Sequence, residues 1–144
     1  MKAVKETAHA KINLFLDVAA KRPDGYHDIK TVMHSLSLAD TLTVSTVPQR
    51  TASISLRVVG NDWLVSDDKN LAVRAARLYL ERAAIRAGIN IKLDKRIPVA
   101  AGLAGGSSDA AATLRAMNKL FDRHFTERAL LDIALELSSM GIRV

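Results

Sequence analysis

The sequence of 144 residues contains no cysteine, only three prolines, and few aromatic side chains, which make up 4% of the chain. The lack of cysteine excludes disulfide bonds, thiolate metal sites and a cysteine nucleophile. The scarcity of aromatic residues argues against a stacking surface for single-stranded nucleic acid. No apolar run approaches the roughly 20 residues that span a bilayer, and residues 1–6 lack the apolar core of a signal peptide. We therefore expect a cytoplasmic protein without a membrane partner.

The residues that are present are typical of one folded domain. Hydrophobic residues make up 49% of the chain and charged residues 25%, a balance that disordered chains do not have. The net charge of +6 would suit a polyanionic partner. However, no run of lysine and arginine exceeds two residues, which favours a solvated basic surface with a nucleotide site. We expect no nucleic-acid partner, and a basic nucleic-acid-binding module is the alternative.

The hydrophobic pattern predicts strands in the first part of the chain. Alternating residues over 10–18 predict a half-buried strand, whose inward face carries Ala10, Ile12, Leu14, Leu16 and Val18. Turn residues fill 21–25. Further strands are expected over 29–37 and 40–47, joined by a tight connection near Ala39 and Asp40, and then over 54–58 and 89–93.

Helices are expected in the second part, over about 69–87, over about 107–121, and after Thr126. The first should be capped by Asp67 or Asp68 and end at Gly88. The last should bury Leu130, Leu131, Ala134 and Leu137. Strands followed by helices with one more strand between them predict an α+β fold rather than a doubly wound sheet.

The most informative segment is the glycine-rich stretch over residues 97–112, which reads IPVAAGLAGGSSDAAA. Glycines have no side chain that could shield the backbone, so the backbone N–H groups at the start of the following helix can bind a phosphate. The spacing matches neither a Walker A loop nor the dinucleotide-binding fingerprint. The alternative is a tight bend that merely packs a helix on a sheet.

This stretch and two others resemble the GHMP kinases, small-molecule kinases that hold the phosphates of ATP on such a loop. Residues 8–16 followed by 22–27 look like the family's substrate segment, and residues 70–76 are similar to a helix start beside the nucleotide. The resemblance covers nearly all of the chain from Ala8 to about Leu137. It is strongest to the branch that phosphorylates a cytidine diphosphate-linked sugar alcohol on its 2-hydroxyl in non-mevalonate isoprenoid synthesis.

The resemblance implies a fold and cofactors. The fold would be the N-terminal domain of a GHMP kinase, a ribosomal-protein-like βαβ arrangement with a mixed sheet and helices packed on one side. The cofactors would be ATP and Mg²⁺. No metal ligand is assigned, because Mg²⁺ would arrive with the nucleotide and Ser107 or Ser108 could reach it. His9 and His34 lack the spacing of metal ligands.

The substrate segment supplies four candidate residues. Lys11 and Asn13 share one face of a strand, because side chains repeat every second residue. The resemblance implies that Lys11 is catalytic and that Asn13 binds the substrate. It also implies that Tyr26 and His27, which follow the turn, contact the cytosine. Taken alone, such a lysine is more often an exposed residue on an edge strand, and the resemblance reverses that preference.

The nucleotide side of the expected site lies on the glycine-rich stretch. The resemblance implies contacts to the β and γ phosphates from Ala101, Gly102, Leu103, Ala104, Gly105, Gly106, Ser107 and Ser108. Asn70 would lie near the adenine or ribose, and Lys95 precedes the turn and could touch the nucleotide. Asp109 falls in the first turn of a helix, where an acidic residue interacts favourably with the dipole, and we interpret it as structural.

The chain departs from the family pattern after residue 136. The family carries a catalytic aspartate in a Gly-Ala/Ser-Asp-Val-Pro context and continues into a second domain. Here residues 137–144 read LSSMGIRV, and the partner aspartate of Lys11 is not found. We therefore expect residues 1–144 to form a truncated ATP-binding domain with weak ATP binding, very low turnover, and self-association through exposed apolar surface. A non-catalytic nucleotide-binding remnant is the alternative.

Overall fold

The computed structural model describes residues 2–48, 52–60, 69–99 and 104–139. Its elements follow the order β1 (Ala3–Lys21), β2 (His27–Val47), β3 (Ser53–Val59), α1 (Leu71–Ala83), β4 (Gly88–Asp94), α2 (Gly105–Leu120) and α3 (Glu127–Ser139). The strands form one sheet in the order β1-β2-β4-β3. β3 and β4 are parallel and flank α1 in the chain, whereas β2 is antiparallel to both of its neighbours.

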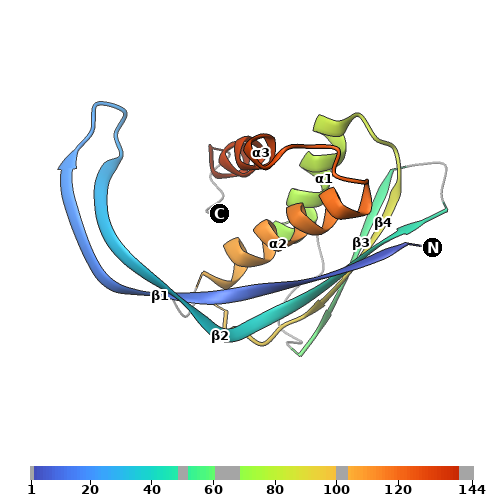
Figure 1. Cartoon of the computed structure of the whole chain (residues 1–144), viewed down its shortest axis with the longest axis horizontal. Coiled ribbons are helices and arrows are strands. Elements are labelled where there is room, and N and C mark those ends of the chain that lie inside the picture. Colours follow the sequence, from blue (N-terminus) through green and yellow to red (C-terminus); the bar gives the residue numbers. More distant parts are fainter. Residues whose placement is uncertain (1, 49–51, 61–68, 100–103, 140–144) are drawn as a thin grey trace.

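The three helices lie on one side of this mixed sheet, with α1 and α2 against its face and α3 packed on α1 and α2 (Figure 1). The sequence-based prediction of an α+β fold with a βαβ unit and helices on one side is therefore confirmed. The core lies between the sheet and α1 and α2. Its largest members on the strands are Leu42, Val44, Ile89, Ile91 and Leu93. Buried alanines on α1 and α2 face them, and their small side chains let the helices approach closely.

The distal part of the β1–β2 hairpin is different, and we call residues 11–35 the arm. It extends beyond the helices and curves toward the side of the sheet on which they lie (Figure 1). Ala10 is fully buried at its base, but Leu14 and Val18 are exposed, together with Val32 and Met33 on β2. The prediction that residues 10–18 form a strand is confirmed. The prediction that Leu14 and Val18 are buried is wrong, because no described layer packs on this part of the strand.

The base of the arm is marked by an irregularity in the strand pairing. His9 pairs with Ala39 but Lys11 pairs with Ser35, so residues 36–38 form a bulge in β2. The His9 Nδ1 atom lies 2.9 Å from the carbonyl oxygen of Leu36, which holds the bulge in place. β2 itself continues through Ala39 and Asp40. The expected tight connection between two strands at these residues is therefore wrong.

The helix boundaries also differ from those expected. Asn70 caps α1, since its side chain accepts a hydrogen bond from Ala72 N at 2.9 Å, whereas Asp67 and Asp68 lie outside the described residues. α1 ends at Ala83 rather than Gly88, because Ala84 adopts a left-handed conformation with φ 54°. Gly88 instead opens β4.

The start of α3 after Thr126 is confirmed, because Thr126 Oγ1 accepts a hydrogen bond from Ala129 N at 3.2 Å. Leu137 is buried, and Leu130 and Ala134 are partly buried. The prediction that Leu131 is buried is wrong: it is 57% exposed. It shares an outward face of the helix with Leu135, one turn later, and that face has no described layer above it.

Candidate functional site

The start of α2 presents backbone N–H groups at the end of the turn from β4. Ala104 caps the helix in a left-handed conformation, with φ 56° and no side-chain hydrogen bond to the cap. The first helical bond of α2 joins Ser108 N to the carbonyl oxygen of Ala104 at 2.9 Å. The N–H groups of Gly105 and Gly106 therefore have no acceptor within the helix, an arrangement that favours an anion. A left-handed alanine costs about 1 kcal/mol or more.

Two glycines let this helix start pack tightly against its neighbours. A Cβ atom at Gly105 would lie 2.9 Å from Lys95 Nζ and 3.0 Å from Ile97 Cγ2. A Cβ atom at Gly106 would lie 3.1 Å from Leu71 Cδ1, at the start of α1. The first turns of α1 and α2 thus meet.

Asn70 directly precedes α1 and lies at this junction. Its side-chain oxygen caps α1 by accepting from Ala72 N, which leaves the amide nitrogen of the side chain as a donor. The structure thus brings Asn70 together with the start of α2.

α2 is also tied to β1 beside the predicted acceptor residues. Ser108 Oγ donates to the carbonyl oxygen of His9 at 2.7 Å, two residues before Lys11. Lys11 is half-buried and Asn13 is exposed. No register shift falls between them, so they face the same side of β1 as predicted, and Asn13 Oδ1 accepts from Thr31 Oγ1 at 3.3 Å.

Tyr26 and His27 lie at the tip of the arm. Gly25 has φ 91°, and Asp24 Oδ1 accepts from Tyr26 N at 3.0 Å, which closes the expected turn. The ring of Tyr26 is 71% exposed. About 30 Å of strand separates Lys11 from the tip. The structure therefore joins Tyr26 and His27 to each other but does not bring them into contact with the start of α2.

Lys95 does not lie where the sequence suggested. Its ammonium is buried, and Nζ lies 2.6 Å from Asp40 Oδ2 and 3.0 Å from Asp109 Oδ2. Asp40 Oδ1 also accepts from Arg96 N at 2.6 Å and from Ile97 N at 2.8 Å. The ammonium that the sequence suggested could touch the nucleotide is thus held in a buried ion pair between β2 and α2.

The two carboxyl groups of this cluster differ in their pKa values. Burial, followed by the proximity of Asp40, raises the pKa of Asp109 to about 8 despite the ammonium of Lys95. Burial alone would raise the pKa of Asp40 as well, but its hydrogen bonds with Asp109, Ile97, Lys95 and Arg96 outweigh that effect and lower it. At neutral pH the cluster therefore holds one carboxylate, one ammonium and one neutral carboxyl group.

Sequence reasoning missed Asp40 altogether. The sequence pattern places it only at a tight connection between two strands and indicates no role for it in the site. The signal that pointed elsewhere was the strictly alternating apolar pattern that continues past it, with Leu42 and Val44 on the same face. The prediction that Asp109 lies in the first turn of the helix is wrong, because α2 already begins at Gly105 and has no acidic residue in its first turn. The burial of Asp109 against Lys95 was not foreseen.

Ala101, Gly102 and Leu103 lie outside the described residues, so their predicted phosphate contacts stay predictions. Among the residues that are described, no group of three or more histidine, cysteine or acidic side chains could hold a metal ion. No helix in the described ranges is long and apolar enough to cross a membrane.

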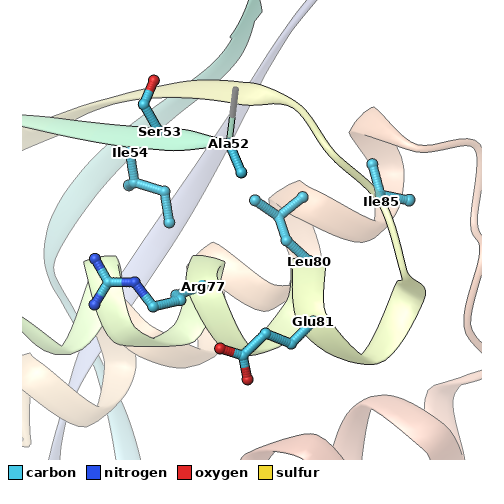
Figure 2. Close-up of a pocket in the computed structure, with 7 residues that line it drawn as sticks. All are labelled: Ala52, Ser53, Ile54, Arg77, Leu80, Glu81 and Ile85. Carbon is cyan, nitrogen blue, oxygen red and sulfur yellow. The ribbon is translucent and has the colours of Figure 1, made fainter. Parts of the chain in front are cut away.

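A separate pocket lies between β3 and α1 (Figure 2). It has a volume of about 320 Å³ and is lined by Ala52, Ser53, Ile54, Arg77, Leu80, Glu81 and Ile85. Glu81 lies ten residues after Leu71, or about 15 Å along α1. Leu71 is the residue of α1 that packs against the start of α2. None of the predicted site residues lines this pocket, which is therefore distinct from the candidate site.

Comparison with known proteins gives consistent results. Residues 70–142 match the family model of the GHMP kinases N terminal domain. The chain is 46% identical over 137 residues to the 4-diphosphocytidyl-2-C-methyl-D-erythritol kinase of Bacillus velezensis, covering 94% of this chain and 46% of that protein. It is 50% identical over 133 residues to the protein of the same name from Geobacillus thermodenitrificans, covering 92% of this chain and 45% of that one.

Solved structures agree with these matches. A crystal structure of 4-(cytidine 5'-diphospho)-2C-methyl-D-erythritol kinase aligns with a TM-score of 0.73 and 40% sequence identity, over 91% of this chain and 46% of that chain. Homoserine kinase from Cytophaga hutchinsonii aligns with a TM-score of 0.73 at 22% identity, which supports the fold alone. The chain spans about half the length of the curated relatives it matches. By its family-model match and its fold, the chain belongs to the GHMP kinase family.

Proposed function

We propose that this chain is the ATP-binding part of a kinase that phosphorylates the 2-hydroxyl of 4-diphosphocytidyl-2-C-methyl-D-erythritol. The observation that carries the proposal is the start of α2. There the N–H groups of Gly105 and Gly106 have no helical acceptor, and Ser108 ties this helix end to the strand that bears Lys11. The assignment of residues 1–144 to an ATP-binding domain is part of the proposal.

Phosphoryl transfer depends mainly on positioning and on electrostatic stabilisation of the transferred group. The helix end would hold the phosphates of ATP through backbone N–H groups and the helix dipole. Ser107 or Ser108 would offer a hydroxyl ligand to a Mg²⁺ ion that enters with the nucleotide. The metal would neutralise charge on the phosphates.

The acceptor would lie along β1. The ammonium of Lys11 would stabilise negative charge that develops on the acceptor oxygen or the transferred phosphate. Asn13, on the same face, would orient the sugar alcohol by hydrogen bonds. At the tip of the arm, Tyr26 offers an exposed ring face for the cytosine and His27 a ring nitrogen for its edge.

Calorimetric titration tests the proposal most directly. The chain is titrated first with a non-hydrolysable ATP analogue and then with 4-diphosphocytidyl-2-C-methyl-D-erythritol, and turnover is measured separately with ATP. We expect the analogue to bind, with Lys11→Met leaving its affinity unchanged while weakening the response to the second ligand. A chain that binds neither ligand would contradict the proposal. Analogue binding without turnover would favour the non-catalytic remnant, and tight, steeply salt-dependent binding to duplex DNA would favour the nucleic-acid module.

We also propose that copies of the chain associate through the arm. Val18 and Ile29 are cross-strand partners in the arm, Met33 lies on the same face of β2 as Ile29, and all three are exposed. Apolar patches of this kind drive association. Light scattering should show a mass that rises with concentration, and Ile29→Lys should reduce the rise. A monomer at every concentration would contradict this.

A further inference from the structure

The buried cluster of Asp40, Lys95 and Asp109 joins three separate parts of the chain. Asp40 lies on β2, Lys95 directly follows β4, and Asp109 lies near the start of α2. All three side chains are at least nine-tenths buried. The cluster lies beneath the turn between β4 and α2, where the ATP phosphates would bind.

We propose that Asp40, Lys95 and Asp109 form a clamp that fixes both ends of this turn and so places the N–H groups of α2 for the phosphates. The inference rests on the proposed function. It makes the three side chains positioning residues, since none of them would touch the nucleotide.

The incoming end of the turn is held by Asp40. Its Oδ1 atom accepts hydrogen bonds from two consecutive backbone donors, Arg96 N at 2.6 Å and Ile97 N at 2.8 Å. Its Oδ2 atom accepts from Lys95 Nζ at 2.6 Å. Both oxygens of one carboxylate on β2 therefore determine the path of residues 95–97.

The outgoing end is held by Asp109 through Lys95. Lys95 Nζ bridges from Asp40 to Asp109 Oδ2, 3.0 Å away, and so links β2 to α2. A Cβ atom at Gly105 would lie 2.9 Å from this ammonium. The first residue of α2 therefore rests directly on the bridging group, and any shift of Lys95 would shift the helix start.

Stability alone does not account for the cluster. A buried ion pair is weak evidence for stability, because the desolvation of its charges offsets their attraction. Asp109 Oδ1 adds a further cost, since it is buried without a hydrogen-bond partner among the described residues. An apolar residue would avoid that cost but could not connect Lys95 to α2.

Paired substitutions test the clamp in the full chain. Asp40→Ala removes the acceptor of Arg96 N and Ile97 N, whereas Asp40→Asn keeps an oxygen there. Asp109→Ala removes the link to α2, whereas Asp109→Asn mimics the neutral carboxyl group. Asp132→Ala is the matched control, because Asp132 is exposed on α3 and its side chain reaches only Arg128 of its own helix. Melting curves first establish that each variant folds.

Two readouts are compared. In the alanine variants we expect the dissociation constant of the non-hydrolysable ATP analogue to rise about tenfold or more, because small misplacements of binding groups weaken their contacts sharply. Amide hydrogen exchange should accelerate at Arg96 and Ile97 in Asp40→Ala, and at Ser108 in Asp109→Ala. Asp109→Asn and Asp132→Ala should stay within about twofold of the parent chain on both readouts. Asp40→Asn should lie between the parent chain and Asp40→Ala, because it keeps one acceptor oxygen but loses the carboxylate that pairs with Lys95 Nζ.

The outcomes separate the two proposals. If the parent chain binds the analogue and folded alanine variants bind it equally well, the clamp is wrong and the proposed function stands. If the parent chain binds no nucleotide, the proposed function fails and the clamp fails with it. If an alanine variant does not fold, amide hydrogen exchange is measured instead in the parent chain, with and without the ATP analogue. The bound analogue must slow exchange at Arg96, Ile97 and Ser108 more than at Leu42. Equal slowing at all four residues would overturn the clamp.

Discussion

The body of the domain and the arm are built from similar alternating strands, but their apolar residues meet different surroundings. In the body, Ile91 on β4 is 2% exposed because α1 and α2 cover the sheet. In the arm, Val32 on β2 is 54% exposed, and the hydrogen-bonded ladder with β1 is its main support. Coverage by the helices rather than sequence pattern therefore separates the buried strand residues from the exposed ones.

The residues of the candidate site are likewise divided between the body and the arm. The predicted nucleotide residues that the structure describes lie at the body, where α1, α2 and the buried cluster hold them together. The predicted cytosine residues lie at the tip of the arm, where Tyr26 is held by turn hydrogen bonds alone. Binding groups in the body should be preorganised, whereas those in the arm should be ordered at some entropic cost when ligand binds.

The largest effect should come from opening the core of the body. Ile91→Ala should lower the free energy of unfolding by about 2–5 kcal/mol, because it removes buried methyl groups and leaves a cavity. Val32→Ala in the arm should change it by less than about 0.5 kcal/mol. Urea denaturation measures both. Equal losses in the two variants would show that the arm is packed as firmly as the body.

The arm should matter for ligand binding rather than for stability. Tyr26→Ala should weaken binding of the cytidine-containing substrate by about 1–3 kcal/mol through loss of ring stacking, with the urea midpoint unchanged. Tyr26→Phe keeps the ring and is the matched control, so it should bind normally. Calorimetry measures the affinity. An alanine variant that binds like the parent chain would place the cytosine elsewhere.

A smaller effect is expected at the start of α2. Gly105→Ala should raise the dissociation constant of an ATP analogue by about tenfold, or about 1.4 kcal/mol. The added methyl group would meet Lys95 Nζ, whose position is fixed by two carboxyl groups. Gly106→Ala should have less effect, because its methyl group would meet only the movable end of Leu71. The reverse order would contradict this packing.

The pH dependence of stability should be the most gradual effect. The pKa of Asp109 is raised to about 8 from its ordinary value of 3.8, so the native state binds more protons than the unfolded state between these values. The free energy of unfolding should therefore decrease as pH rises from about 4 to about 8. The lowered pKa of Asp40 acts in the opposite sense, but only below its ordinary value.

Asp109→Asn is the control for this prediction, because its side chain cannot lose a proton. Urea unfolding at several pH values should show a shallower decline in the variant than in the parent chain. Identical slopes would mean that Asp109 is ionised throughout the range and that the cluster carries a net negative charge at neutral pH.

Much of the fold could be predicted because its signals are local. Alternation identified the strands, helical spacing identified the helices, and Thr126 marked the start of α3 correctly. The errors at Asp40 and Leu131 share one cause. The local sequence pattern indicates which side chains could be buried. It does not indicate whether another part of the chain packs over them or forms an ion pair with them.

The candidate site was predictable to a similar extent. The glycine-rich start of a helix, and the placement of Lys11 and Asn13 on one strand face, follow from short-range geometry. The burial of Lys95 could not be foreseen, because its partners Asp40 and Asp109 lie 55 and 14 residues away in sequence. Ion pairs between distant residues depend on sheet order and helix packing.

The sequence by itself determined the α+β class, the glycine-rich helix start and the family of this protein, because short-range patterns and long matching segments encode them. Only the tertiary structure decided that the ammonium of Lys95 is buried between two carboxyl groups, and that the apolar residues of the arm are exposed. Both depend on which surfaces meet when the chain folds, and a linear pattern does not contain that information.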